Sequence, residues 1–280
     1  MKMNGYKLIA SDLDGTFLNG EMEITPENTR AIAALRERGV EFVPASGRTF
    51  GEMDPELREH PDLRYYIYSD GAVVFDKETG EMDTACMDCE LCNRIFDILE
   101  EFQVFLVAHC GGNSYIDGER MQPSVLEHHR ISRYYGMILA ERNRAVTGFR
   151  EFYRSREEIE QIFVFFHSDD ELAECRRRLL RLGEVQVLSS EPGTFEIVSA
   201  CAGKGNGLLR LAKRLGIDPS QTVAVGDSCN DLSMLQAAGL SLAVSNAWEE
   251  VKAAADRTIC SNDEHIVPYI LEHIMKENTV

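Results

Sequence analysis

The chain has 280 residues, of which 44% are hydrophobic, and it carries a formal net charge of −18 at pH 7. This charge disfavours binding to nucleic acids or to anionic membrane surfaces, because both require a basic protein surface. No apolar run approaches the roughly 20 residues of a membrane-spanning helix, and no signal-peptide pattern is visible, so we expect a cytoplasmic protein. The sequence leaves the oligomeric state open.

The first predicted strand leads into two closely spaced carboxylates. Residues 6–10 form a short apolar run, which is typical of a buried strand, and Asp12-Leu13-Asp14-Gly15-Thr16 follows it. Ligands of open α/β sheets bind at the carboxyl ends of the strands. Two carboxylates placed there are unfavourable unless a cation or several hydrogen-bond donors compensate their charge. The motif therefore predicts a divalent-metal site, with an ordinary Asp-Gly turn as the alternative.

A helix and a second strand follow. Thr25 is the predicted N-cap, with Pro26 at the first helical position, and Gly39 ends the helix. The strand at residues 40–45 should return parallel to the first, because a strand–helix–strand crossover connects parallel strands. It ends in Ser46-Gly47-Arg48, where a hydroxyl, backbone N–H groups and a cation at a strand-to-helix turn predict a phosphate site. Helix capping by Ser46 and an ion pair of Arg48 are the alternatives.

The middle of the chain has a different pattern. After predicted strands at residues 65–68 and a hairpin arm at residues 72–80, no further carboxylate motif follows a strand until residue 222. The predicted helices and strands of this stretch are 90–102, 104–108, 162–167, 169–182 and 185–188. We therefore predict an inserted α+β domain over residues 86–190. Residues 1–85 and 191–280 should together form the core domain.

Three cysteines at equal spacing lie where this insert begins. Cys86, Cys89 and Cys92 resemble part of an iron–sulfur ligand run, but the fourth cysteine and its proline are missing. Cysteine is also a common small buried residue. We expect free thiols here rather than an iron–sulfur or zinc site.

The last third of the chain supplies two more motifs. Lys204 opens a predicted helix, and its charge suits a phosphoryl group or a nucleophilic carboxylate, with a solvated lysine as the alternative. A predicted strand then ends in Gly226-Asp227-Ser228-Cys229-Asn230-Asp231, where Asn230 and Asp231 could alternatively cap the next helix. Together the patterns predict an α/β fold, a doubly wound and mostly parallel sheet with the inserted domain as a lid.

These motifs, in this order, resemble those of the haloacid dehalogenase (HAD) superfamily phosphatases, in the Cof-type subfamily IIB with a large α/β cap. The resemblance covers nearly the whole chain and is carried by the four motifs quoted above, with weaker similarity at Ser245-Asn246-Ala247 and at residues 261–264. One departure lies at Ser69-Asp70-Gly71-Ala72, where relatives usually carry Asn-Gly-Ala. Aspartate is nearly isosteric with asparagine but anionic.

The residues predict phosphoryl transfer through an aspartyl-phosphate, with Asp12 as the nucleophile and Lys204 organising it. The resemblance implies Mg²⁺ held by the carboxylates of Asp12 and Asp227 and by the backbone carbonyl of Asp14. The side chain of Asp14 would then act as general acid and base. Asp231 is expected to support the metal or Lys204. The predicted contacts to phosphate or substrate are Thr16, Ser46, Gly47, Arg48, Lys204 and Asn230.

The predicted function is Mg²⁺-dependent hydrolysis of a small phosphorylated metabolite, which could be a sugar phosphate, a nucleotide or a cofactor phosphate. A phosphosugar mutase of related architecture and a non-catalytic phosphometabolite sensor remain as alternatives. A dinucleotide-binding protein is disfavoured, because the first strand leads to aspartates and not to Gly-x-Gly-x-x-Gly. One or two cap arginines are expected to contact an extra anionic group of the substrate. The candidates are Arg130, Arg133, Arg142, Arg144, Arg150, Arg154 and Arg156.

Overall fold

The computed structural model describes residues 5–189 and 192–275, which form two compact units. The first unit contains the chain up to Gly47, Met53–Thr84 and the chain from Gly203 onward. The second unit contains Arg48–Glu52 and Ala85–Ala202. None of the described helices is both long enough and apolar enough to span a bilayer.

A parallel five-stranded sheet forms the centre of the first unit, in the order β16-β15-β14-β1-β2. Its strands are β1 (Leu8–Ser11), β2 (Glu41–Pro44), β14 (Thr222–Gly226), β15 (Leu240–Ala243) and β16 (Arg257–Thr258). β1 pairs in parallel with both β2 and β14, so Ser11 lies between Pro44 and Val225 at one edge of the sheet. The predicted parallel return of the second strand is confirmed.

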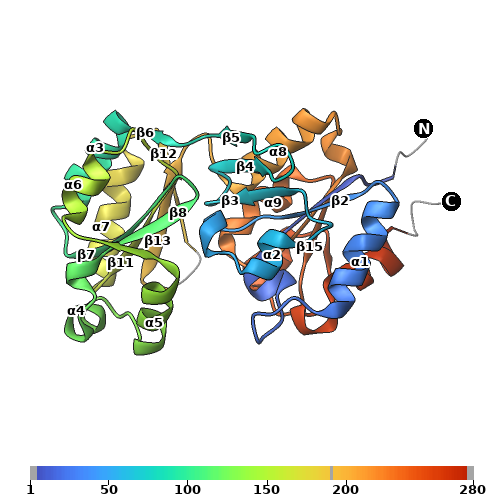
Figure 1. Cartoon of the computed structure of the whole chain (residues 1–280), viewed down its shortest axis with the longest axis horizontal. Helices are drawn as coiled ribbons and strands as arrows, with labels where there is room; N and C mark the ends of the chain where they lie inside the picture. The colour runs from blue at the N-terminus through green and yellow to red at the C-terminus, as the bar shows by residue number, and fades with distance from the viewer. Residues whose placement is uncertain (1–4, 190–191, 276–280) are drawn as a thin grey trace. The chain divides into compact units, whose positions relative to one another are not determined.

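The helices of the first unit cover both faces of this sheet. They are α1 (Pro26–Glu37), α2 (Pro55–Glu59), α8 (Lys204–Leu215), α9 (Leu232–Ala237), α10 (Glu249–Ala254) and α11 (Ile266–Tyr269). The chain moves from β1 to β2 in one direction and from β14 to β15 in the other. Since such crossovers are right-handed, α1 and α9 lie on opposite faces. Figure 1 shows α1 beside the C-terminal helical segment, which it contacts through α11. The sheet is doubly wound, as predicted.

Local sequence explains where these elements begin. Leu8, Ile9 and Ala10 of β1 are fully buried, as the apolar run predicts. The hydroxyl of Thr25 accepts the N–H of Asn28 at 3.3 Å, which satisfies one of the free donors at the start of α1.

A small antiparallel sheet follows β2 in the chain. It consists of β3 (Tyr65–Tyr68), β4 (Val73–Asp76) and β5 (Met82–Thr84), in that order. A parallel bridge between Ala45 and Ile67 joins it to the end of β2. The turn from β3 to β4 places Ser69, Asp70 and Gly71 consecutively at positive φ.

The second unit is built on a six-stranded sheet in the order β12-β13-β11-β7-β8-β9, antiparallel except between β8 and β9. Its strands are β7 (Val104–Cys110), β8 (Asn113–Asp117), β9 (Arg144–Val146), β11 (Gln161–Phe166), β12 (Val185–Leu188) and β13 (Thr194–Ser199). A short two-stranded sheet pairs β6 (Met87–Asp88) with β10 (Glu158–Ile159).

Helices pack against this sheet, as Figure 1 shows. The helices of the unit are α3 (Cys89–Leu99), α4 (Pro123–His128), α5 (Arg133–Arg142), α6 (Phe149–Arg154) and α7 (Asp169–Leu180). Ile162, Val164 and Phe166 of β11 pack in one core with residues of α3, α6 and α7. Phe165 points to the other face and packs with Leu126 of α4 and Leu139 of α5. The α+β character of the insert agrees with the prediction.

The predicted extent of the insert is wrong at its C-terminal end. The predicted boundary at residues 190 and 191 lies outside the described residues, but the next strand, β13, still belongs to the second unit. The reason is strand pairing, because β13 lies between β11 and β12, with Ile197 opposite Ile162 and Val187. The first unit resumes at Gly203. The short segment Arg48–Glu52 also belongs to the second unit, where the N–H of Gly51 donates to the carbonyl of Gly112.

The equally spaced cysteines lie around the start of α3. Cys89 is exposed and Cys92 is buried, and both are free thiols. The thiol of Cys92 donates to the carbonyl of Met87, and burial raises the pKa of this thiol to about 12. Cys92 therefore serves as a small core residue of the helix.

The ion pair of Asp76 with Arg64 should stabilise the first unit in a pH-dependent way. Asp76 is buried at the end of β4 and accepts from Arg64 Nε at 3.1 Å and Nη2 at 2.8 Å. The hydrogen bond from Arg64 is the main cause that lowers the pKa of Asp76. We expect Asp76→Asn to lower the free energy of unfolding at pH 7 by about 2–4 kcal/mol, because Arg64 loses its carboxylate.

Asp76 has a lower pKa in the folded state than the value of about 3.9 expected in the unfolded state. The ion pair therefore contributes its full stabilisation at pH values above about 3.9. The stabilisation is lost as the pH falls through the folded-state pKa. The stabilities of the two proteins should therefore begin to approach each other below about pH 4 and become equal only below the folded-state pKa. Urea unfolding at several pH values measures this, with Asp170→Asn at an exposed position as the control. A difference that stays constant from pH 7 to pH 3 would contradict the assignment.

Candidate active site

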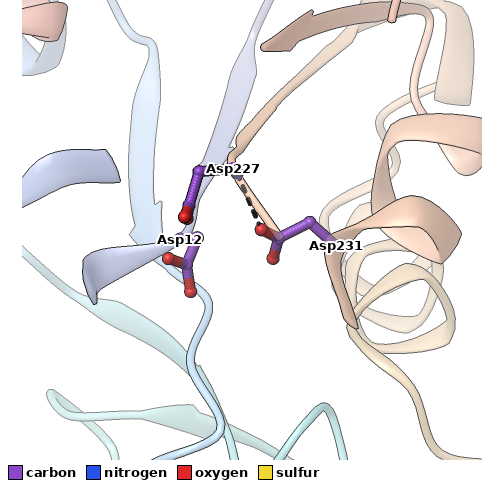
Figure 2. Close-up of side chains that lie close together, drawn as sticks. All are labelled: Asp12, Asp227 and Asp231. Atoms are coloured by element: carbon purple, nitrogen blue, oxygen red, sulfur yellow. Dashed lines mark hydrogen bonds between the residues drawn. The ribbon is translucent and has the colours of Figure 1, made fainter. Parts of the chain in front are cut away.

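Adjacent parallel strands bring two of the predicted carboxylates together. Asp12 follows β1 and Asp227 follows β14, and the N–H of Asp12 donates to the carbonyl of Val225 at 2.9 Å. Oxygen atoms of Asp12, Asp227 and Asp231 lie within 4.8 Å of one another. Figure 2 shows the three side chains close together, with Asp227 directed toward Asp12. From β1 the chain continues to β2 on one side, whereas β14 lies on the other side of β1 and is followed by β15. The carboxyl ends of β1 and β14 are therefore the expected ligand-binding position of the sheet.

Lys204, the first residue of α8, contacts two of these carboxylates. Its side chain is fully buried, and Nζ donates to Asp12 Oδ1 and to Asp231 Oδ1, each at 2.6 Å. Glycine at position 205 allows this placement, because a Cβ there would overlap the carbonyl oxygen of Ser233. The close approach of α8 to α9 therefore sets where the ammonium group lies.

Asp231 uses both carboxylate oxygens within the protein. Oδ1 accepts from Lys204, and Oδ2 accepts the N–H groups of Asp227 at 2.9 Å and Ser228 at 3.1 Å. The first of these backbone bonds is the dashed line in Figure 2. Gly226 makes room for this residue, since a Cβ there would lie 2.5 Å from the Cβ of Asp231. Asp231 thus orients both Lys204 and the loop that carries Asp227.

The loop after β1 is fixed against the loop after β14. The hydroxyl of Thr16 donates to Asp227 Oδ1 at 2.9 Å, and its contact with phosphate stays a prediction. Gly15 has a φ of 77°, and a Cβ there would lie 2.9 Å from Asp227 Oδ2. Asn246, noted in the sequence only as a weak similarity, donates to the carbonyl of Gly15 at 2.7 Å.

Asp14 lies between these anchored residues. Its backbone has φ −74° and ψ 117°, which is not helical, and its side chain is half-buried. It is not a member of the compact carboxylate group, which contains Asp12, Asp227 and Asp231. The predicted metal contact through the backbone carbonyl of Asp14 stays a prediction.

Except for Arg48, the predicted phosphate contacts lie on four segments of the first unit, after β1, β2 and β14 and at the start of α8. Ser46 is buried just after β2, and its N–H donates to the carbonyl of Ile67. A 3₁₀ turn, Phe50–Glu52, follows in place of the expected helix start. Asn230 is buried, and its Nδ2 donates to Asp70 Oδ1 at 3.1 Å. Arg48 belongs to the second unit, so its substrate contact remains a prediction.

The protonation equilibria reflect the crowding of carboxylates. Burial raises the pKa of Asp12 well above its usual range; Lys204 opposes this effect and the neighbouring carboxylates add to it. Burial, aided by Asp231, raises the pKa of Asp227 to about 6. Burial alone would lower the pKa of Lys204, but Asp12 and Asp231 outweigh it and hold that pKa well above its usual range. Lys204 is therefore a permanent cation of the site.

The donor set fits a hard divalent cation. Raised pKa values at Asp12 and Asp227 mean that Lys204 does not fully compensate the buried negative charge. Carboxylate oxygens are the ligands that Mg²⁺ prefers in proteins. Because Asp231 already accepts from Lys204 and from two backbone N–H groups, Asp12 and Asp227 are the better placed metal ligands.

Replacing Asp231 by asparagine should be strongly destabilising. Both oxygens of Asp231 accept hydrogen bonds, so an amide NH₂ would face either the Lys204 ammonium or two backbone N–H groups. We expect Asp231→Asn to lower the free energy of unfolding by about 2–4 kcal/mol, since donors are left unpaired in a buried site. Chemical denaturation measures the loss, with Asp170→Asn as the exposed control. Equal stability of the two variants would show that Asp231 does not hold these donors.

Comparison with known proteins agrees with this geometry. A family model of haloacid dehalogenase-like hydrolases matches residues 9–271. The phosphatase YwpJ of Bacillus subtilis (strain 168) is 30% identical over 284 residues, which cover 96% of this chain and 100% of that protein. The 5-amino-6-(5-phospho-D-ribitylamino)uracil phosphatase YwtE of the same organism is 28% identical, with 96% and 98% covered.

Solved structures agree as well. A haloacid dehalogenase-like hydrolase from B. subtilis superposes with a TM-score of 0.81 at 30% identity, covering 96% of this chain and 99% of that one. The HAD subclass IIB sugar phosphatase BT4131 shares the fold, with a TM-score of 0.80 at 23% identity and the same coverage. The family match and the full-length similarity show that the chain belongs to the haloacid dehalogenase-like hydrolases and is a phosphatase of the Cof type.

Proposed function

We propose that this phosphatase depends on Mg²⁺ and hydrolyses a small phosphomonoester through an aspartyl-phosphate on Asp12. The observation that carries the proposal is the 2.6 Å contact of Lys204 with Asp12, within a group of carboxylates able to bind a cation. The ammonium group holds one Asp12 oxygen and keeps the carboxylate oriented for attack. A cytoplasmic location and a cap function for the second unit belong to the same proposal.

Two displacement steps follow from these positions. In the first, the Asp12 carboxylate attacks phosphorus, the bond to the leaving oxygen breaks, and protonated Asp14 gives its proton to that oxygen. In the second, Asp14 takes a proton from water, the water oxygen attacks phosphorus, and the bond to Asp12 breaks. The products are an alcohol and inorganic phosphate, and both carboxyl groups return to their starting states.

The remaining side chains bind and orient. Ser46, Lys204 and Asn230, together with the backbone at Gly47, would hold the phosphoryl oxygens. Thr16 and Asp231 would position Asp227 through the hydrogen bonds described above. Mg²⁺, held by Asp12, Asp227 and the carbonyl of Asp14, would supply positive charge to the phosphoryl oxygens.

Contacts within the second unit narrow the search for substrate-binding arginines. Three of the seven candidates already form ion pairs: Arg130 with Asp169, Arg150 with Glu100, and Arg154 with Asp97 and Glu100. Two others, Arg144 and Arg156, lie over the rings of Tyr115 and Phe152. Arg133, at the start of α5, is therefore the first candidate to test for contact with an additional anionic group.

Phosphate release should require both the metal and Asp12. We expect release from at least one member of a panel of sugar phosphates, nucleotides and cofactor phosphates, with Mg²⁺ and not with chelator. The compound named for the relative YwtE belongs in the panel. Asp12→Asn should reduce the rate by at least about a thousandfold, because the nucleophile is lost.

Asp76→Asn is the matched control. It changes an aspartate that is paired with Arg64, so this variant should keep its activity. Undiminished release by Asp12→Asn would contradict the nucleophile assignment. Turnover that needs a bisphosphate activator and frees no phosphate would indicate the mutase instead. Binding of phosphorylated compounds without any turnover would indicate the sensor.

Mg²⁺ affinity should depend on pH through Asp227. Because burial raises the pKa of Asp227 to about 6, protons compete with the metal for this carboxylate below that pH. We expect the dissociation constant for Mg²⁺ to rise about tenfold for each pH unit below 6. Calorimetry at pH 5 to 8 measures it, and a constant affinity over this range would remove Asp227 as a ligand.

A further inference from the structure

Three chain segments that carry predicted phosphate contacts meet at Asp70. The N–H of Asp70 donates to the carbonyl of Ser46 at 3.0 Å, and its carbonyl accepts the N–H of Gly203, the residue before Lys204, at 2.8 Å. Its side-chain Oδ1 accepts Asn230 Nδ2 at 3.1 Å. Asp70 is fully buried. One residue therefore contacts the segments of Ser46, Lys204 and Asn230.

The backbone at this point adopts an uncommon conformation. Ser69 and Asp70 each have a φ of 48°, and Gly71 follows with a φ of 77°. Aspartate and asparagine tolerate the left-handed region better than other residues with a Cβ. Gly71 permits a close approach to α8, because a Cβ there would overlap the carbonyl oxygen of Gly203. Consecutive residues at positive φ persist only where surrounding contacts hold them.

The side chain of Asp70 determines how the amide of Asn230 is oriented. Asn230 Oδ1 accepts the hydroxyl of Ser228 at 2.7 Å, while Nδ2 donates to Asp70. An ionised carboxylate can only accept, so the NH₂ end of the amide must face Asp70. A Cβ on Gly47 would lie 3.2 Å from Asp70 Oδ2, which places this carboxylate directly beside the turn that follows Ser46. The NH₂ group of Asn230 is therefore directed to the side where Ser46 and Gly47 lie.

Asp70 also brings negative charge to a site meant for an anion. Its carboxylate accepts from Asn230 Nδ2 at 3.1 Å and lies beside Gly47, and both residues are predicted phosphate contacts. A phosphate held by Asn230 and the backbone at Gly47 would be repelled by this charge at short range. Asparagine at this position would keep an acceptor for Asn230 and remove the charge.

We propose that Asp70 is a positioning residue of the phosphate subsite, which fixes the amide of Asn230 and weakens the binding of phosphate through its negative charge. The inference rests on the proposed function, in which Ser46, Lys204 and Asn230 bind the phosphoryl oxygens. Its consequence is faster loss of inorganic phosphate after hydrolysis, at the expense of affinity.

Two variants separate the charge from the hydrogen bond. Asp70→Asn removes the charge alone, whereas Asp70→Ala removes the charge and the acceptor. The probe is inorganic phosphate, titrated calorimetrically into the Mg²⁺-loaded protein. We expect the Asn variant to bind phosphate on the order of tenfold more tightly than the unmodified protein. The Ala variant should bind about tenfold more weakly than the Asn variant, because the amide of Asn230 is no longer fixed.

Asp76→Asn is the matched control, since Asp76 is a buried aspartate of the same small sheet and is paired with Arg64. It should lose stability without any change in phosphate affinity. If alanine does not fold at the positive φ of position 70, Asp70→Gly removes the same acceptor without backbone strain. Phosphate affinity of the Asn variant equal to that of the unmodified protein would overturn the charge effect. Equal affinities of the Asn and Ala variants would overturn the positioning role.

The outcome for the proposed function is separate. An unmodified protein that neither binds phosphate nor releases it from any substrate would contradict the proposed function and, with it, this inference. An unmodified protein that does both, with variants of unchanged affinity and unchanged KM, would contradict the inference about Asp70 alone.

Discussion

The buried ammonium group of Lys204 is the interaction on which the rest of the site depends. A lysine with no solvent exposure is stable only if its partners replace the lost hydration, and Asp12 and Asp231 do so at 2.6 Å each. These three residues come from the start of α8, the end of β1 and the loop after β14. The ion triad therefore joins elements far apart in the sequence, and the same contacts that stabilise the core orient the predicted nucleophile.

Backbone packing makes this triad possible. Glycine at position 205 lets α8 approach α9, and glycine at position 226 lets Asp231 fold back over the end of β14. Asp231 then fixes the N–H groups of Asp227 and Ser228. Asp231 therefore links the start of α8 to the loop that carries Asp227.

The second unit differs from the first in its sheet and in the role of its charged residues. Its sheet is mostly antiparallel, and its arginines are largely paired with its own acids, as Arg150 and Arg154 are with Glu100. Burial alone would raise the pKa of Glu100, but hydrogen bonds from Arg150, Arg154 and Tyr153 outweigh it and lower that pKa to about 2. A high local count of arginines therefore reflects surface ion pairing here, and it is a poor guide to where a substrate anion binds.

The sequence by itself determined that the first unit is a doubly wound, mostly parallel sheet, and where its chemically important residues lie along the chain. Short apolar runs mark β1, β2 and β14, and each leads into a polar motif. A buried parallel strand can place functional side chains only where it ends, at the carboxyl edge of the sheet. Parallel pairing then places Asp12 next to Asp227. The family could be identified on these motifs alone.

Only the tertiary structure decided which side chains contact one another and where the insert ends. Residues 194–199 look like any apolar strand, and their pairing with β11 and β12 is a long-range contact that no local pattern encodes. The contact of Thr16 with Asp227 and the junction at Asp70 depend in the same way on loops from distant strands. The residue type determines whether a side chain can donate or accept a hydrogen bond. The tertiary structure determines which group lies close enough to be its partner.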